Sequence, residues 1–234
     1  MEAEVTEYFS ALFQGRHVAS PDGPVDSGHT FQPDEAFFPA FLEGLPSLSE
    51  EDKEALEQPL TLGELQEAVE GAAPHKSPGL DGLSYELYKT TFTEVGPPLL
   101  DAFNAMLAEG ILTASLRQGV VRLLPKVAGV PMASQLRPIT LLGTDYKLLT
   151  KILVARLIPV LPSVLRSTQL CSVRGRSIFD GPASILSSAE YLHRHQKPGY
   201  LMSLDFFHAY DRVSLPWVDK VWRPWALEPF SEAG

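Results

Sequence analysis

The sequence contains a single cysteine, Cys171, and no long apolar run. One cysteine cannot form a disulfide within the chain, which fits a reducing compartment. No apolar stretch reaches the roughly 18 residues that a membrane-spanning helix needs. The chain begins with MEAE, which is acidic where a secretory signal is basic. We therefore expect a protein of the cytoplasm or the nucleus, without a membrane partner.

Basic residues are outnumbered, with 19 Lys and Arg against 29 Asp and Glu and a net charge of −10. They are also unevenly distributed. Residues 1–73 hold 16 acids and 2 bases, whereas residues 116–176 hold 10 bases and one acid, Asp145. A segment this basic is typical of a surface that binds phosphates, but solvated helix faces have the same composition. Charge alone leaves both interpretations open.

The hydrophobic content of 44% is sufficient for a folded core, and the apolar pattern indicates mixed secondary structure. Apolar periodicity and capping residues predict helices over residues 2–13, 50–57, 61–73, 84–93, 97–110, 144–158 and 177–194. Residues 119–126 and 135–141 predict an antiparallel hairpin, with Pro138 at an edge or a strand end. A further run, residues 200–204, predicts a buried strand that ends at Asp205. Short strands mixed with helices indicate an α+β fold.

Asp205 is a candidate ligand for Mg²⁺, a hard cation that prefers oxygen donors. A two-metal site requires additional carboxylates. After Asp211 the sequence offers only Asp219, Glu228 and Glu232, none of them beside another strand-like run. The metal-binding apparatus is therefore expected to be incomplete. Without further context, an aspartate after an apolar strand usually only caps a turn.

Five short motifs occur in a distinctive order. They are Lys76–Gly82 (KSPGLDG), Leu124–Lys126 (LPK), Arg137–Leu142 (RPITLL), Gln169–Arg176 (QLCSVRGR), and Leu204-Asp205 with Ala209–Asp211 (LD and AYD). In this order and spacing the chain resembles a non-LTR (LINE-type) retrotransposon reverse transcriptase. The acidic N-terminal part is similar to the segment that joins endonuclease to polymerase in such polyproteins. The resemblance covers nearly the whole chain.

The resemblance implies a division of the chain into three parts. Residues 1–58 are expected to form an acidic, helical, linker-like segment. Residues 59–222 are expected to form a partial reverse transcriptase domain, and residues 223–234 a divergent tail. The implied fold is α+β, with mainly helical fingers, a short antiparallel β-hairpin, and the first strand and helix of a reverse-transcriptase palm.

The resemblance also implies roles for individual residues. Asp205 matches the first metal-binding aspartate, Lys126 and Arg137 match residues that contact the nucleotide triphosphate, Tyr210 matches the aromatic residue beneath the incoming sugar, and Lys76, Arg174 and Arg176 are candidates for nucleic-acid contacts. A lysine and an arginine on neighbouring strands can clamp phosphates. The alternatives are structural: an ordinary turn lysine, an exposed edge arginine, a half-buried packing tyrosine, and a loop between helices at residues 76–82.

Departures from the family pattern concern the catalytic centre. The strand with the paired aspartates and the thumb have no counterpart, His208 stands where the family usually has lysine, and Cys171-Ser172 replace Gly-Phe. We therefore expect a truncated polymerase fragment without independent activity that holds Mg²⁺, the family's cofactor, at most weakly.

Two other hypotheses stay open. One is a non-catalytic RNA-binding or interaction module that uses the basic segment 116–176, with RNA, DNA or a complementary palm fragment as partner. The other is an unselected relic whose exposed palm edge makes it prone to aggregation. Zinc binding is rejected, because His193 and His195 cannot share a helix face and the chain has one cysteine.

Overall fold

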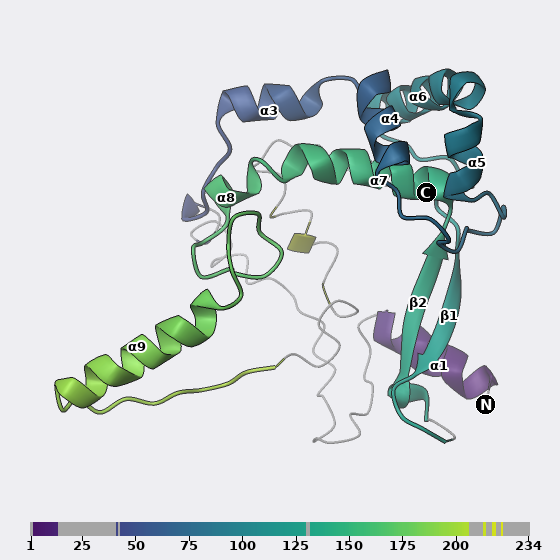
Figure 1. The fold of residues 1–234 in the computed structure, drawn as a ribbon. Helices are drawn as coiled ribbons and strands as arrows, with labels where there is room; N and C mark the ends of the chain where they lie inside the picture. Colours follow the sequence, from purple (N-terminus) through teal and green to yellow (C-terminus); the bar gives the residue numbers. More distant parts are fainter. Residues whose placement is uncertain are drawn as a thin grey trace.

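The computed structural model describes residues 2–13, 41, 43–129, 132–205, 213, 217–218 and 221. The helices are α1 (Glu2–Phe13), α3 (Glu50–Glu57), α4 (Leu62–Glu70), α5 (Tyr85–Thr90), α6 (Phe92–Glu109), α7 (Thr144–Leu157), α8 (Leu161–Val164) and α9 (Asp180–Arg194), and the strands are β1 (Gly119–Pro125) and β2 (Leu136–Leu142) (Figure 1). The α+β class is confirmed. None of these described helices has the length and apolar character needed to cross a bilayer.

Side-chain caps start α3 and α4 where the sequence predicts them. The Ser49 hydroxyl accepts a hydrogen bond from the Asp52 N–H at 3.1 Å. The Thr61 hydroxyl accepts one from the Glu64 N–H at 3.3 Å, and the Glu64 carboxylate accepts the Thr61 N–H at 2.8 Å. This reciprocal pair is a capping box, which satisfies backbone donors that a helix start leaves without partners.

The main hydrophobic core lies among α4, α5, α6 and α7 (Figure 1). Phe103 of α6, Leu65 of α4 and Leu148 of α7 are fully buried there. Val69 joins them, as the helical spacing predicts. Leu62, which helical spacing places on the same face, is 41% exposed, because it lies in the first turn of α4, at the edge of the core.

Helix α6 begins at Phe92, five residues before the predicted start at Pro97. Hydrogen bonds from the Glu94 and Val95 N–H groups to the Thr91 carbonyl form its first turn upstream of the prolines. Pro97 and Pro98 therefore lie inside the helix, where each removes one backbone hydrogen bond. The predicted end is confirmed, since Gly110 adopts the left-handed conformation, with φ of 68°.

Strands β1 and β2 pair in antiparallel register, from Gly119 opposite Leu142 to Pro125 opposite Leu136. The predicted hairpin is confirmed. Helix α1 packs against one face of it, where Phe9 and Leu12 contact Leu136 and the partly buried Leu123. This second, smaller cluster anchors the hairpin, which extends away from the helical core (Figure 1).

The sequence predicts Thr144 as the cap of α7, and this is wrong, because Thr144 is the first helical residue and Gly143 is the N-cap. The Thr144 side chain is buried, and its hydroxyl donates a 2.5 Å hydrogen bond to the Leu83 carbonyl instead of capping its own helix. Helix α7 ends at Leu157, in agreement with the break predicted at Pro159.

The buried strand predicted to end at Asp205 is not formed. Residues 200–205 belong to no strand, and Tyr200, Leu201 and Leu204 are largely exposed. Helix α9 likewise has no buried residue, and the segment that follows it runs back beside the helix before diverging from it (Figure 1). A strand needs a hydrogen-bonded neighbour, and the sheet of the described residues holds only β1 and β2. Most of the helix predicted after Asp205 lies outside the described residues.

Candidate nucleotide and nucleic-acid site

Side chains of the hairpin alternate between two faces, as the period of a strand requires. The face turned away from α1 carries Arg122, Leu124 and Lys126 from the first strand and its continuation, and Gln135, Arg137 and Ile139 from the second. We call these six residues the open face. None of the six is acidic, and five are exposed, while Gln135 is partly buried. The open face is therefore a cationic surface on a hairpin that α1 supports from behind.

Lys126 and Arg137, the predicted phosphate-binding pair, lie on this open face. The Lys126 N–H donates to the Gln135 carbonyl at 2.8 Å, which extends the strand pairing by one residue. Its ammonium group donates to the Ser134 carbonyl at 3.2 Å. Arg137 pairs with Leu124 and is diagonal to Lys126, a relation that separates Cβ atoms by about 7–8 Å. The structure brings the pair together, and its role toward a nucleotide stays a prediction.

Arg122 belongs to the same face, and sequence reasoning did not identify it. It is exposed and lies opposite Ile139, diagonal to Arg137 on the side away from Lys126. The signal was present in the sequence, because residues 122, 124 and 126 alternate along one strand and must project to the same side. The family motif starts at Leu124 and does not include it.

The loop around Lys76 connects α4 to α5, so the structural interpretation of this motif as a helix-to-helix loop is confirmed. Lys76 itself is exposed. The Lys147 ammonium group donates to the Ser77 carbonyl at 2.8 Å. A Cβ atom on Gly79 would lie 2.6 Å from the Cα of Gly143, so the loop backbone is in direct contact with the junction of β2 and α7. Only glycine fits at this approach.

Arg176 is engaged within its own loop. Its guanidinium group donates to the carbonyls of Pro162 at 3.4 Å, Leu165 at 2.9 Å, Arg166 at 2.6 Å and Gln169 at 2.7 Å. Binding a phosphate would compete with these bonds. Arg174, two residues earlier, is exposed and makes no hydrogen bond in the part of the chain that the structure describes. Of the two, Arg174 is the side chain that is available to a ligand.

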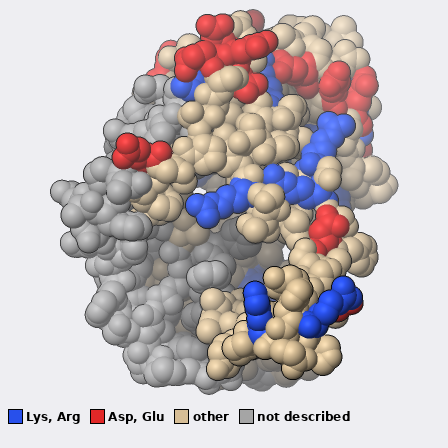
Figure 2. Space-filling view, turned by 90° about the vertical axis from the view of Figure 1, so that its left-hand side faces the viewer, with Lys and Arg blue, Asp and Glu red and all other residues tan. Residues whose placement is uncertain are grey.

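The basic segment 116–176 divides into two sets. Four of its ten basic side chains are partly buried and donate hydrogen bonds to backbone carbonyls: Lys147, Lys151, Arg156 and Arg176. The other six are exposed: Arg117, Arg122, Lys126, Arg137, Arg166 and Arg174. Figure 2 shows acidic side chains gathered at the level of α3, with Lys and Arg side chains below them. Part of the positive charge is therefore structural, and among the six exposed side chains Lys126 also donates to a backbone carbonyl.

The strongest ion pair of the described residues joins Arg156 of α7 to Glu64 of α4. The guanidinium group contacts both carboxylate oxygens, at 2.5 and 2.8 Å. The hydrogen bond from Arg156 is the main cause that lowers the pKa of Glu64 from 4.5 to about 2, against the opposing effect of burial, and the Thr61 N–H adds to it. The carboxylate thus supports both the capping box and the packing of α7 on α4.

This lowered pKa predicts a loss of stability in acid. Because the folded-state pKa lies below the unfolded value, the contribution of Glu64 is fully present above about pH 4.5 and disappears as the pH falls toward 2. We expect the free energy of unfolding, measured by urea denaturation, to fall over this range. Glu64→Gln should have a lower free energy of unfolding at pH 7, and this free energy should decrease less in acid than that of the wild type. An unchanged acid dependence in Glu64→Gln would contradict the assignment.

Asp205, the predicted metal ligand, is exposed and lies at the end of the described segment that follows α9. Tyr210 and Asp211 lie outside the described residues. Within the described ranges, no three His, Cys, Asp or Glu side chains gather in a group that could hold a metal ion.

Comparison with known proteins identifies the family. The profile of the reverse transcriptases (RNA-dependent DNA polymerases) matches residues 124–229, which include Lys126, Arg137 and Asp205. The "Transposon TX1 uncharacterized 149 kDa protein" of Xenopus laevis is 38% identical over 171 residues, which are 73% of this chain. The chain spans 13% of the length of that relative. The sequence belongs to the reverse transcriptases of the LINE type.

Proposed function

We propose that this chain supplies the part of the fingers subdomain that binds phosphates in a LINE-type RNA-directed DNA polymerase, and that it does not join nucleotides by itself. One observation carries the proposal. Lys126 and Arg137 project from the same exposed face of a hairpin, and no acidic side chain shares that face with them. Two neighbouring cations repel each other. The arrangement therefore does not stabilise the hairpin, but it suits the binding of an anionic ligand.

The chemistry of the pair suits a nucleotide. Phosphoryl transfer depends on positioning and on neutralising the charge of the phosphates. Arg137 can donate two parallel hydrogen bonds to phosphate oxygens, and Lys126 adds a compact charge. Leu123 and Leu136 pack against α1 on the opposite face of the hairpin. Lys126 and Arg137 therefore project from strands that a helix stabilises.

The absence of independent activity is the second part of the proposal. Reverse transcriptases use divalent metal ions, which activate the attacking oxygen and stabilise the leaving one when carboxylates hold them in pairs. Asp205 is the position of this chain that matches such a carboxylate most directly, and it lies in an exposed segment that belongs to no strand. We expect no stable Mg²⁺ site in the chain by itself, and a palm-containing polypeptide as the partner that completes it.

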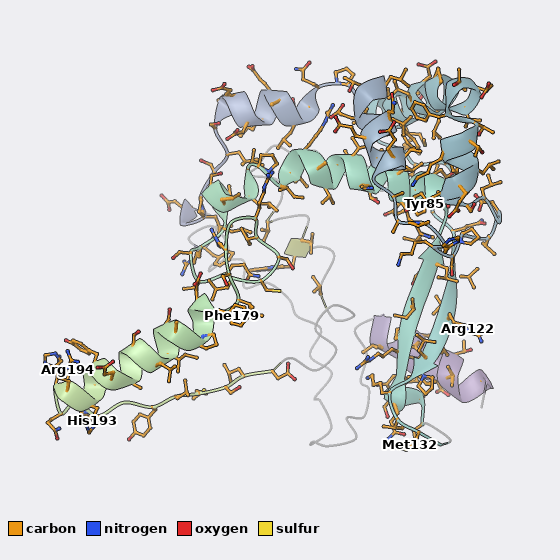
Figure 3. The ribbon with its side chains drawn as sticks, in the orientation of Figure 1. Tyr85, Arg122, Met132, Phe179, His193 and Arg194 are labelled. Atoms are coloured by element: carbon orange, nitrogen blue, oxygen red, sulfur yellow. The ribbon has the colours of Figure 1, made fainter. Side chains whose placement is uncertain are left out.

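Nucleotide binding tests the first part. We expect Arg137→Gln to weaken the binding of a fluorescent deoxynucleoside triphosphate about tenfold or more, since a hydrogen bond to a charged group is worth about 1.5–3 kcal/mol. Arg194→Gln is the matched control, because Arg194 lies on α9, far from the hairpin (Figure 3). Equal affinities of the two variants would refute the role of Arg137.

Primer extension tests the second part. The purified chain should incorporate no nucleotide on an RNA template with Mg²⁺ or Mn²⁺. Metal-dependent incorporation that Asp205→Asn abolishes would refute the proposal.

A non-catalytic RNA-binding role is the second candidate, and the six exposed basic side chains of segment 116–176 favour it. Its signature is affinity that falls steeply with salt, because neutralising phosphates releases counterions. Undetectable binding at low salt would exclude this role.

A further inference from the structure

We propose that Arg122 makes the open face a binding site for single-stranded polynucleotide, and that this residue separates the binding of a polynucleotide from the binding of a nucleotide. The inference rests on the proposed function, since it extends the surface formed by Lys126 and Arg137. It does not come from the family pattern, because Arg122 lies outside the matched residues 124–229.

The register of the hairpin places three cations in a zigzag. Arg137 pairs with Leu124, which lies midway between Arg122 and Lys126 on the facing strand. Arg137 is therefore diagonal to both, at about 7–8 Å between Cβ atoms. Arg122 and Lys126 are four residues apart, which corresponds to about 13 Å along a strand.

The length of the anion determines how many of these three cations it can contact. A triphosphate joins its phosphorus atoms through single bridging oxygens, so it is short enough for Lys126 and Arg137 alone. A polynucleotide places a whole sugar unit between successive phosphates. Such an extended anion can engage Arg122 and Lys126 at the same time without the two side chains bending toward each other.

Two apolar side chains lie between the cations and fit the rest of a nucleotide chain. Leu124 is 47% exposed and Ile139 is 43% exposed, each directly opposite an arginine of the open face. Aliphatic surface beside cations gives sugars and bases a place to lie while the phosphates are neutralised. Single-stranded sites in other proteins combine a cationic track with apolar contacts in the same way.

Arg122 is available for this role. It makes no hydrogen bond or ion pair within the described part of the chain, and it projects from β1 into solvent (Figure 3). Its neighbours on this side of the hairpin are Val120, Leu124, Arg137, Ile139 and Leu141, none of which is an acid. No carboxylate of the open face therefore offsets the charge of Arg122.

The test measures two ligands with the same variants. Wild type, Arg122→Gln, Arg122→Lys, Arg137→Gln and Arg194→Gln are titrated with a fluorescent deoxynucleoside triphosphate and with 12-mers of uridylate and of thymidylate over a range of salt concentrations. Homopolymers keep base pairing out of the measurement. Thermal unfolding checks that each variant is folded.

We expect Arg122→Gln to weaken the binding of both 12-mers severalfold and to leave triphosphate binding unchanged. The slope of log affinity against log salt concentration should decrease in magnitude by about 0.7, the value for one phosphate contact on a single strand. Arg122→Lys should keep the wild-type salt slope, because it keeps the charge. RNA and DNA 12-mers should respond alike, because the contact is to phosphate.

Three results would overturn the inference: no binding of either 12-mer by wild type, 12-mer affinity of Arg122→Gln equal to that of Arg194→Gln, or an equal loss of triphosphate and 12-mer binding in Arg122→Gln. A different result would refute the proposed function: equal affinities of Arg137→Gln and Arg194→Gln for the triphosphate. The two failures are therefore distinguishable.

Discussion

Replacing Arg156 with methionine should lower the free energy of unfolding by about 3–5 kcal/mol. The guanidinium group is mostly buried between α7 and the start of α4. Besides the two oxygens of Glu64 it contacts the carbonyls of Leu56, Gln58 and Pro59. Methionine fills part of the volume but donates no hydrogen bond, so a partly buried carboxylate and three carbonyls would lose their partner.

Urea denaturation at pH 7 measures this effect, and α9 offers a matched control. Arg194 forms an ion pair with Glu190 at 2.7 Å, in which both side chains are well exposed. Exposed helix pairs of this kind contribute about 0.3–0.5 kcal/mol, so Arg194→Met should be nearly neutral. Similar losses in the two variants would mean that Arg156 does not hold α7 to α4.

Replacing Phe103 with alanine should cost about 3–5 kcal/mol, the usual range for a buried aromatic residue. The side chain has an exposed fraction of 0% in the core formed by α4, α5, α6 and α7. Its removal leaves a cavity among the side chains of these four helices. The urea concentration at the midpoint of unfolding should decrease, and the dependence of the free energy of unfolding on urea concentration should stay unchanged.

Phe179→Ala is the control for Phe103→Ala. Phe179 precedes α9 and is 79% exposed (Figure 3), so the same change of side chain should alter stability by no more than about 0.5 kcal/mol. If Phe179→Ala destabilised the protein as much as Phe103→Ala, the division between the helical core and the exposed α9 would be wrong.

Local chemistry explains what the sequence predicted well. The capping residues Ser49 and Thr61 act over three residues, and the strands around the hairpin loop are close in the sequence, so short motifs determine these starts and pairings. Gly110 ends α6 for a similar local reason. Lys126 and Arg137 were identified through the resemblance to the reverse transcriptase family, and the register of the hairpin places them on one face.

Features that the sequence left open or predicted wrongly have several physical causes, of which distant contacts are the first. Arg156 and Glu64 are 92 residues apart, and Lys151 reaches a carbonyl 83 residues away, so the sequence could not show that these bases are structural. The start of α6 depended on a turn at Thr91 that carries no side-chain cap. The segment ending at Asp205 has the composition of a strand, but composition does not supply a neighbouring strand.

The contact of Gly79 with Gly143 limits how the hairpin can move. The backbones of the Lys76 loop and of the β2–α7 junction lie against each other there, with no room for a side chain at residue 79, so β2 cannot move closer to this loop without overlap. A larger residue at position 79 would push the loop and the strand apart. This point of contact lies at the end of the hairpin next to the helical core, away from Lys126 and Arg137.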